Sequence, residues 1–220
     1  MTQATRGDAT REALIRAAID VFGRDGFDAT RTRTIAETAK VNQALIGYHF
    51  RNKEGLYLAV FADIVEQIRA RIGPVLAEIE AALDGDPPPG REDGLALLFR
   101  MTDAFILLMA GTESNPWAQL VVREQQSPTA AFALLHDGLM RPVSRGLIRL
   151  VQHIDPVAQA GDPRLVVATI MGQMLVFRVA RAAVLRIIDQ PAIGPDEIVA
   201  IQGQLRRNLT AMLVPAGDRS

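Results

Sequence analysis

The residues best suited to binding chemistry lie on one short helical stretch, between Gln43 and Phe50. Gln43, near its start, can pair with adenine through both its amide oxygen and its amide nitrogen, and Ala44 can contact a thymine methyl group. Further along, Tyr48 and His49 can donate hydrogen bonds to phosphate oxygens. These residue types at this spacing indicate a helix whose exposed side meets the DNA major groove.

Two cations flank this stretch. Arg33, at the start of the preceding helix, could reach guanine or phosphate, and Lys53 begins the next helix, where its ammonium group and nearby backbone N–H groups favour an anion. Between Arg31 and Lys53 the chain carries five Lys or Arg and a single acid, Glu37. Each residue alone fits an ordinary surface or packing role, so the DNA hypothesis depends on their occurring together.

Apolar spacing predicts the elements that hold these residues. A first helix is expected over residues 9–25, a second over 32–40 and a third over 43–50. Gly26 should end the first helix in a left-handed turn, and Asn42 should cap the third. The second and third helices, joined by a tight turn, have the pattern of a helix-turn-helix.

The remainder of the chain is also predicted to be helical, because no segment alternates with period two. A fourth helix should start near residue 52 and stop or kink at Gly73-Pro74. Further helices are expected over 95–110, 116–126, 128–154 (kinked by Pro142), 163–188 and 195–213. We therefore predict an all-α fold: a three-helix DNA-binding head over residues 1–52 and a larger helical effector-binding and dimerisation domain over 53–220.

Composition narrows the function classes. The 220 residues include no cysteine, so disulfides, thiolate metal sites and cysteine catalysis are excluded. The polar N-terminus and the lack of a long apolar run predict neither a signal peptide nor a membrane span, which makes a cytoplasmic protein the default. Three histidines stand without a nucleophile elbow, phosphate loop or metal-ligand spacing, so we expect no catalytic residue, metal or cofactor. The net charge of −1 argues weakly against DNA.

Residues 9–61 resemble the N-terminal domain of the TetR family of bacterial transcriptional regulators. Three motifs carry the resemblance: F-x-x-x-G-F/Y-x-x-T from Phe22, I-A-x-x-A-x-V from Ile35, and Y-H-F-x-x-K-E-x-L from Tyr48. The resemblance implies that the DNA contacts are made by Arg33, Gln43, Ala44, Tyr48, His49 and Lys53.

This chain departs from the family pattern at three positions. Lys40 replaces a frequent glycine between the helices, which implies a strained turn or a longer second helix. Asn42 replaces the usual Ser or Thr cap. Gly47 stands where many members have tyrosine, so one phosphate contact is missing and base preference cannot be copied from a relative.

Residues 115–142 and the stretch GQMLVFRVARAAVLR are similar to the CerR-like subset of TetR regulators, which implies a helical ligand-binding and dimerisation domain. An effector pocket needs apolar walls with a few polar groups. The candidates are Phe105, Met109, Trp117, Arg123, Phe132, His136, Met174, Phe177 and Arg178. Arg178, amid apolar neighbours, is expected to pair with a carboxylate such as Glu124 or with an acidic ligand, while the Met and Phe residues have an alternative role as plain core.

The 163–188 helix is apolar around most of its circumference, which indicates burial on several sides. With the last helix it could form half of a four-helix bundle across a two-fold axis, and burial within a monomer is the alternative. The candidate dimer contacts are Val176, Val179, Ala183, Leu205 and Leu209.

These features together predict a homodimer that binds a double-stranded DNA operator, with half-sites about 34–36 Å apart, and responds to an unidentified small molecule. Repression is the expected sign. An activator, a helical protein-interaction module without ligand sensing, and an enzyme are the alternatives.

Overall fold

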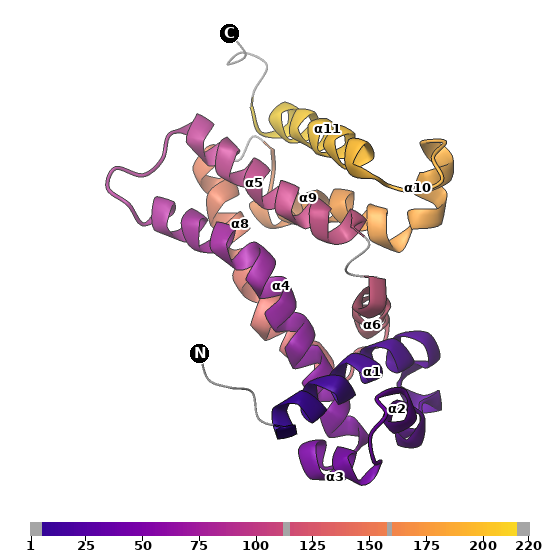
Figure 1. Cartoon of the computed structure of the whole chain (residues 1–220). Coiled ribbons are helices and arrows are strands. Elements are labelled where there is room, and N and C mark those ends of the chain that lie inside the picture. The colour runs from indigo at the N-terminus through magenta and orange to yellow at the C-terminus, as the bar shows by residue number, and fades with distance from the viewer. Residues whose placement is uncertain (1–5, 112–114, 158–159, 215–220) are drawn as a thin grey trace. The chain divides into compact units, whose positions relative to one another are not determined.

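The computed structural model describes residues 6–111, 115–157 and 160–214, and within these ranges every regular element is a helix (Figure 1). The predicted all-α fold is confirmed. The elements are α1 (Arg6–Ala29), α2 (Thr32–Thr38), α3 (Ala44–Phe50), α4 (Lys53–Leu83), α5 (Arg91–Ala110), α6 (Asn115–Gln126), α7 (Ala130–Leu135), a π-helix (His136–Met140), α8 (Arg141–Ile154), α9 (Pro163–Val179), α10 (Arg181–Ile187) and α11 (Pro195–Leu213).

The chain divides into two compact units. Unit 1 combines Met1–Gln67 with Ser114–Leu139, and unit 2 combines Ile68–Glu113 with Met140–Ser220. The units do not coincide with the predicted division at residue 52, because α6 packs against α1 and α7 packs against α6. Helix α4 contributes residues to both units.

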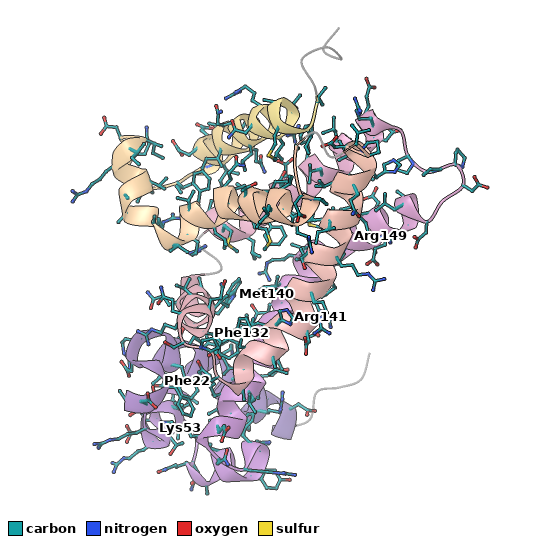
Figure 2. The ribbon with its side chains drawn as sticks, turned by 180° about the vertical axis from the view of Figure 1, so that it is seen from behind. Phe22, Lys53, Phe132, Met140, Arg141 and Arg149 are labelled. Carbon is teal, nitrogen blue, oxygen red and sulfur yellow. The ribbon has the colours of Figure 1, made fainter. Side chains whose placement is uncertain are left out.

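An aromatic cluster forms the centre of unit 1. The ring of Tyr57 lies 5.0 Å from Phe22, 4.8 Å from Phe27 and 4.9 Å from Phe61. Phe27 reaches the cluster because Gly26 adopts a φ of 79°, which redirects the chain at the predicted end of the first helix. Phe22 lies among the helices of this unit (Figure 2). The rings thus bring α1 and α4 together behind the helix-turn-helix.

A buried carboxylate lies next to this cluster. Glu124 of α6 is only 1% exposed, and its Oε2 accepts a hydrogen bond of 3.1 Å from the Tyr57 hydroxyl. Its Oε1 accepts from the backbone N–H of Thr129 at 2.5 Å and from the Thr129 hydroxyl at 2.7 Å. These donors compensate for the loss of water around a buried charge. Glu124 thereby links α6, α4 and the residue that caps α7.

Unit 2 is built around α5, which packs against α8, α9 and α11. Arg149 of α8 donates to Asp84 at 2.6 Å at the end of α4 (Figure 2). No single described helix is long and apolar enough to span a membrane; α9 and α10 pass that test only as a pair that bends by 89°.

One helix prediction was wrong, and two were confirmed in part. Residues 163–188 form two helices, because the chain bends by 89° after α9. Residues 128–154 form α7, a π-helical turn and α8, with Pro142 in the first turn of α8. Helix α4 does not stop at Gly73-Pro74, because Pro74 is exposed and water can satisfy the carbonyl that loses its partner, while the alternative of a kink stays a prediction. The last predicted helix, 195–213, is confirmed.

Two glycines of unit 1 make a matched pair for a stability test. A Cβ at Gly55 would lie 2.0 Å from the carbonyl oxygen of Phe50, whereas a Cβ at Gly47 would meet no atom within 4 Å. We expect Gly55→Ala to lower the free energy of unfolding by about 1–3 kcal/mol. We expect Gly47→Ala to raise it by about 0.5–1 kcal/mol, because alanine favours the helix. Urea denaturation measures both, and equal effects of the two changes would contradict the close approach at Gly55.

Tyr57→Phe tests the buried carboxylate. Removing the hydroxyl leaves Glu124 Oε2 without its donor, so the free energy of unfolding should fall by about 1–3 kcal/mol at neutral pH. Burial, reinforced by the Glu124 charge, raises the pKa of Tyr57 above its ordinary value. The stability that this shift contributes is present below about pH 10 and is lost as the pH rises further, because the unfolded chain ionises first. Denaturation of Tyr57→Phe should therefore show a smaller loss above that pH, and an unchanged pH profile would argue against the interaction.

Candidate nucleic-acid interface

The turn between α2 and α3 is held by backbone geometry and one cap. Lys40 adopts a φ of 55°, which confirms the strained turn expected at this position. The N–H of Val41 then donates to the carbonyl of Ala36 at 3.0 Å. The Asn42 side chain accepts from the N–H of Ala44 at 2.8 Å, which confirms the predicted cap. These contacts fix the angle at which α3 leaves α2.

Helix α3 has one buried side and one exposed side. Ile46 and Phe50 are buried in the core of unit 1. Tyr48 is 81% exposed, the His49 ring lies 4.9 Å from it, and Ala44 is also exposed. The outer side of α3 therefore leaves a large aromatic side chain accessible to a binding partner.

Gln43 is exposed and oriented by a neighbour. Its Nε2 donates to the Thr32 hydroxyl at 3.0 Å, across the two helices. The amide oxygen and the second amide hydrogen remain for the bidentate pairing with adenine that the sequence suggested. Thr32 was not among the predicted site residues, and the sequence signal for it was only its place at the start of the second helix.

The two predicted cations are engaged with their own chain. Arg33 donates to Glu37 at 2.8 Å, and this hydrogen bond raises the pKa of Arg33. The Lys53 ammonium donates to the carbonyls of Thr30 at 2.9 Å and Asp28 at 3.3 Å. Lys53 therefore also fastens the start of α4 to the end of α1 (Figure 2). Contact of either cation with DNA remains a prediction, as it does for Gln43, Ala44, Tyr48 and His49.

The candidate effector residues divide between the units. Trp117, Arg123, Phe132 and His136 belong to unit 1, and Phe105, Met109, Met174, Phe177 and Arg178 belong to unit 2. In unit 1, Arg123 Nη2 approaches the carbonyl of Arg24 at 3.5 Å. The residues of unit 2 come from α5 and α9, which pack together.

Glu124 is not among the contacts found for Arg178, and pairing with another carboxylate or with an acidic ligand stays a prediction. The Arg178 guanidinium donates to the carbonyls of Leu108 at 3.2 Å and Gly111 at 2.8 Å, at the C-terminal end of α5. The Glu124 carboxylate is instead bound by Tyr57 and Thr129. Burial, together with the nearby charge of Arg181, lowers the pKa of Arg178.

The candidate dimer residues fall into two groups. Val176 is 41% exposed and Val179 is 58% exposed, and Ala183 on α10 is also exposed. Leu205 and Leu209 of α11 are buried within their own chain, so they are not available as contact residues. The dimer prediction is thus left with α9 and α10.

Comparisons with known proteins cover both parts of the chain. Residues 14–60 match the model for bacterial regulatory proteins of the tetR family. Residues 96–214 match the C-terminal domain of the HTH-type transcriptional dual regulator CecR. This match confirms that the C-terminal part resembles a subset of TetR regulators, which the sequence analysis called CerR-like.

Two curated relatives differ in how much they cover. The chain is 34% identical to the HTH-type transcriptional dual regulator CecR of Shigella flexneri over 217 residues, which is 98% of this chain and 96% of the relative. It is 34% identical to the HTH-type nicotine-responsive transcriptional repressor HdnoR of Paenarthrobacter nicotinovorans over 112 residues, about half of each chain (51% and 52%).

Solved structures show the same fold at low identity. The crystal structure of AibR in complex with isovaleryl coenzyme A and operator DNA has a TM-score of 0.68 at 13% identity and covers 94% of this chain and 99% of that one. FadR from Bacillus subtilis in complex with stearoyl-CoA has a TM-score of 0.63 at 18% identity, covering 91% and 97%. The two family models and the 34% identity to CecR over 217 residues show that the chain belongs to the TetR family of bacterial transcriptional regulators, in the group with the CecR-type C-terminal domain.

Proposed function

We propose that the protein is a homodimeric repressor that binds a palindromic DNA operator and is released by a small molecule. The observation that carries the DNA part is the exposed side of α3, with Tyr48 81% exposed and Gln43 oriented by Thr32. Such a helix, inserted by its N-terminal residues into a major groove, reads base edges while neighbouring cations bind phosphates.

The proposed dimer forms through α9 and α10. Val176 and Val179 are large apolar side chains left exposed by the folded chain, and Ile187 of α10 is 81% exposed. These exposed apolar side chains are the contacts proposed for the second copy of the chain. A two-fold dimer carries two copies of α3, which suits the two half-sites of a palindrome.

The proposed effector contacts lie between α5 and α9. Phe105 and Met174 are buried there, and the Arg178 guanidinium stands at the end of α5. An apolar wall with a cation suits a ligand that has an apolar body and an acidic group. Two similar folds were solved with acyl-CoA ligands, and one relative is named as nicotine-responsive, so small-molecule control is a supported proposal, whereas the ligand itself is not copied from them.

We propose that the protein lowers transcription of its target genes, because two relatives, HdnoR and NicS of Pseudomonas putida, are named repressors. Activation is the second candidate, since CecR is named a dual regulator. A reporter driven by the DNA upstream of the protein's gene distinguishes them: deletion of the regulator raises reporter output under repression and lowers it under activation.

Alanine at Gln43 or Tyr48 should weaken DNA binding and leave the fold intact. For Gln43, loss of a bidentate base contact costs about 1–3 kcal/mol, which is roughly a 5- to 150-fold loss of affinity for a preferred sequence; for Tyr48, a proposed phosphate contact is lost. Gel shift with DNA upstream of the gene measures the loss, and light scattering provides the control that the molar mass is unchanged. Folded wild-type protein that fails to shift this DNA at low salt would overturn the proposed function.

Val179→Glu should dissociate the proposed dimer, because a two-fold axis would bring two carboxylates into an apolar contact. Analytical ultracentrifugation should then show a monomer where the wild type sediments as a dimer. Val157→Glu is the matched control, since Val157 is 68% exposed but lies in the turn after α8. A dimer that persists in Val179→Glu would rule out this surface.

A further inference from the structure

An open hollow of about 470 Å³ lies beside α3, on the helix-turn-helix of unit 1. Its lining consists of Thr32, Asn42, Gln43, Ala44, Ile46, Gly47, Arg51 and Asn52. The space beside Gly47 is open, because a Cβ built at this position would meet nothing within 4 Å. The absent side chain therefore leaves room beside the reading helix that a larger residue would occupy.

The lining offers hydrogen-bond donors and one positive charge. Arg51, the residue after α3, is exposed, and a φ of 71° turns the chain sharply there. None of the residues that line the hollow carries a carboxylate. A guanidinium has five N–H donors and no acceptor, which suits an anion with several oxygens.

Two asparagines add neutral donors. Asn42 Oδ1 accepts from the N–H of Ala44 at 2.8 Å, and Asn52 Oδ1 accepts from the N–H of Gly55 at 2.7 Å. Because each amide oxygen is used by the backbone, each asparagine has its NH₂ group left to donate. The hollow is thus lined by donors whose complement is an oxyanion.

We propose that this hollow binds a phosphate of the DNA backbone, with Arg51 as its charged donor and Asn42 and Asn52 as neutral donors. This inference rests on the proposed DNA binding and deepens it. Gln43 and Ala44, which are proposed to meet base edges, also line the hollow, so a strand read by them would carry its own phosphates past Arg51. Arg51 would supply a backbone contact on the side that Gly47 leaves open.

Salt dependence tests the proposal directly. Each phosphate contact contributes about 0.9 to the slope of the logarithm of the association constant against the logarithm of the salt concentration. We therefore measure the anisotropy of a fluorescein-labelled duplex of random sequence at several salt concentrations, with wild-type protein and with Arg51→Gln. The slope of Arg51→Gln should be shallower by about 0.9 per bound protomer, and its affinity near 0.1 M salt should be roughly five- to tenfold lower.

Two further variants separate the hollow from general charge and from misfolding. Arg145→Gln removes the same charge from an exposed position on α8, outside the lining, and should change the slope by clearly less. Gly47→Leu fills the hollow without removing a charge, so it should bind the duplex more weakly while its melting temperature stays at or above that of the wild type.

The outcomes distinguish this inference from the proposed function. If the wild type binds and Tyr48→Ala weakens binding, but Arg51→Gln behaves like Arg145→Gln, the phosphate site is overturned and the DNA-binding function stands. Undiminished binding by Gly47→Leu would overturn the hollow as a contact. A wild type that binds neither the random duplex nor the upstream DNA overturns both.

Discussion

Helix α3 has only seven residues, and a helix of that length does not persist alone in water. Its shape is therefore imposed by what lies under it: Ile46 and Phe50 in the core, and Gly55 directly against the last carbonyl of the helix. The exposed side of α3 is a consequence of this anchoring, since residues between the anchors have no place in the core. The proposed DNA contacts depend on a small number of buried atoms behind them.

The same dependence explains why unit 1 includes a segment that is remote in sequence. A three-helix head alone would leave the aromatic cluster around Tyr57 incomplete on one side, and α6 brings Glu124 to the Tyr57 hydroxyl. The sequence-based division at residue 52 followed the motif, which ends there. The compact units depend on which side chains are buried together. No local sequence pattern indicates that a helix more than 60 residues later completes a core.

Periodicity and caps predicted most helices because these signals are local. Asn42 accepts a hydrogen bond from the N–H of Ala44, as predicted for a cap, and Gly26 adopts the positive φ predicted for it. The bend after α9 has no such signal: Ala180 is neither Gly nor Pro, and the chain turns where Arg178 and Arg181 bind the carbonyls that end α5. Long-range hydrogen bonds of this kind override helix propensity, which is only a weak preference.

For the candidate site residues, too, local features could be predicted from the sequence and long-range contacts could not. Exposure of Gln43 and Tyr48 could be predicted, because the apolar positions around them were already assigned to the core. The Thr32 contact with Gln43 and the carbonyl contacts of Lys53 could not, since they depend on which side chains the turn brings together.

The left-handed backbone of Lys40 has a consequence for binding kinetics. Lys40 has a φ of 55°, and adopting this backbone conformation costs a residue with a side chain about 1–2 kcal/mol more than it costs glycine. Lysine at this turn instead places a cation between α2 and α3, where it attracts a polyanion over about 10 Å in 0.1 M salt. If the proposed DNA binding holds, the conformational cost at Lys40 would be offset by electrostatic steering, which would speed the encounter with DNA before any base is read.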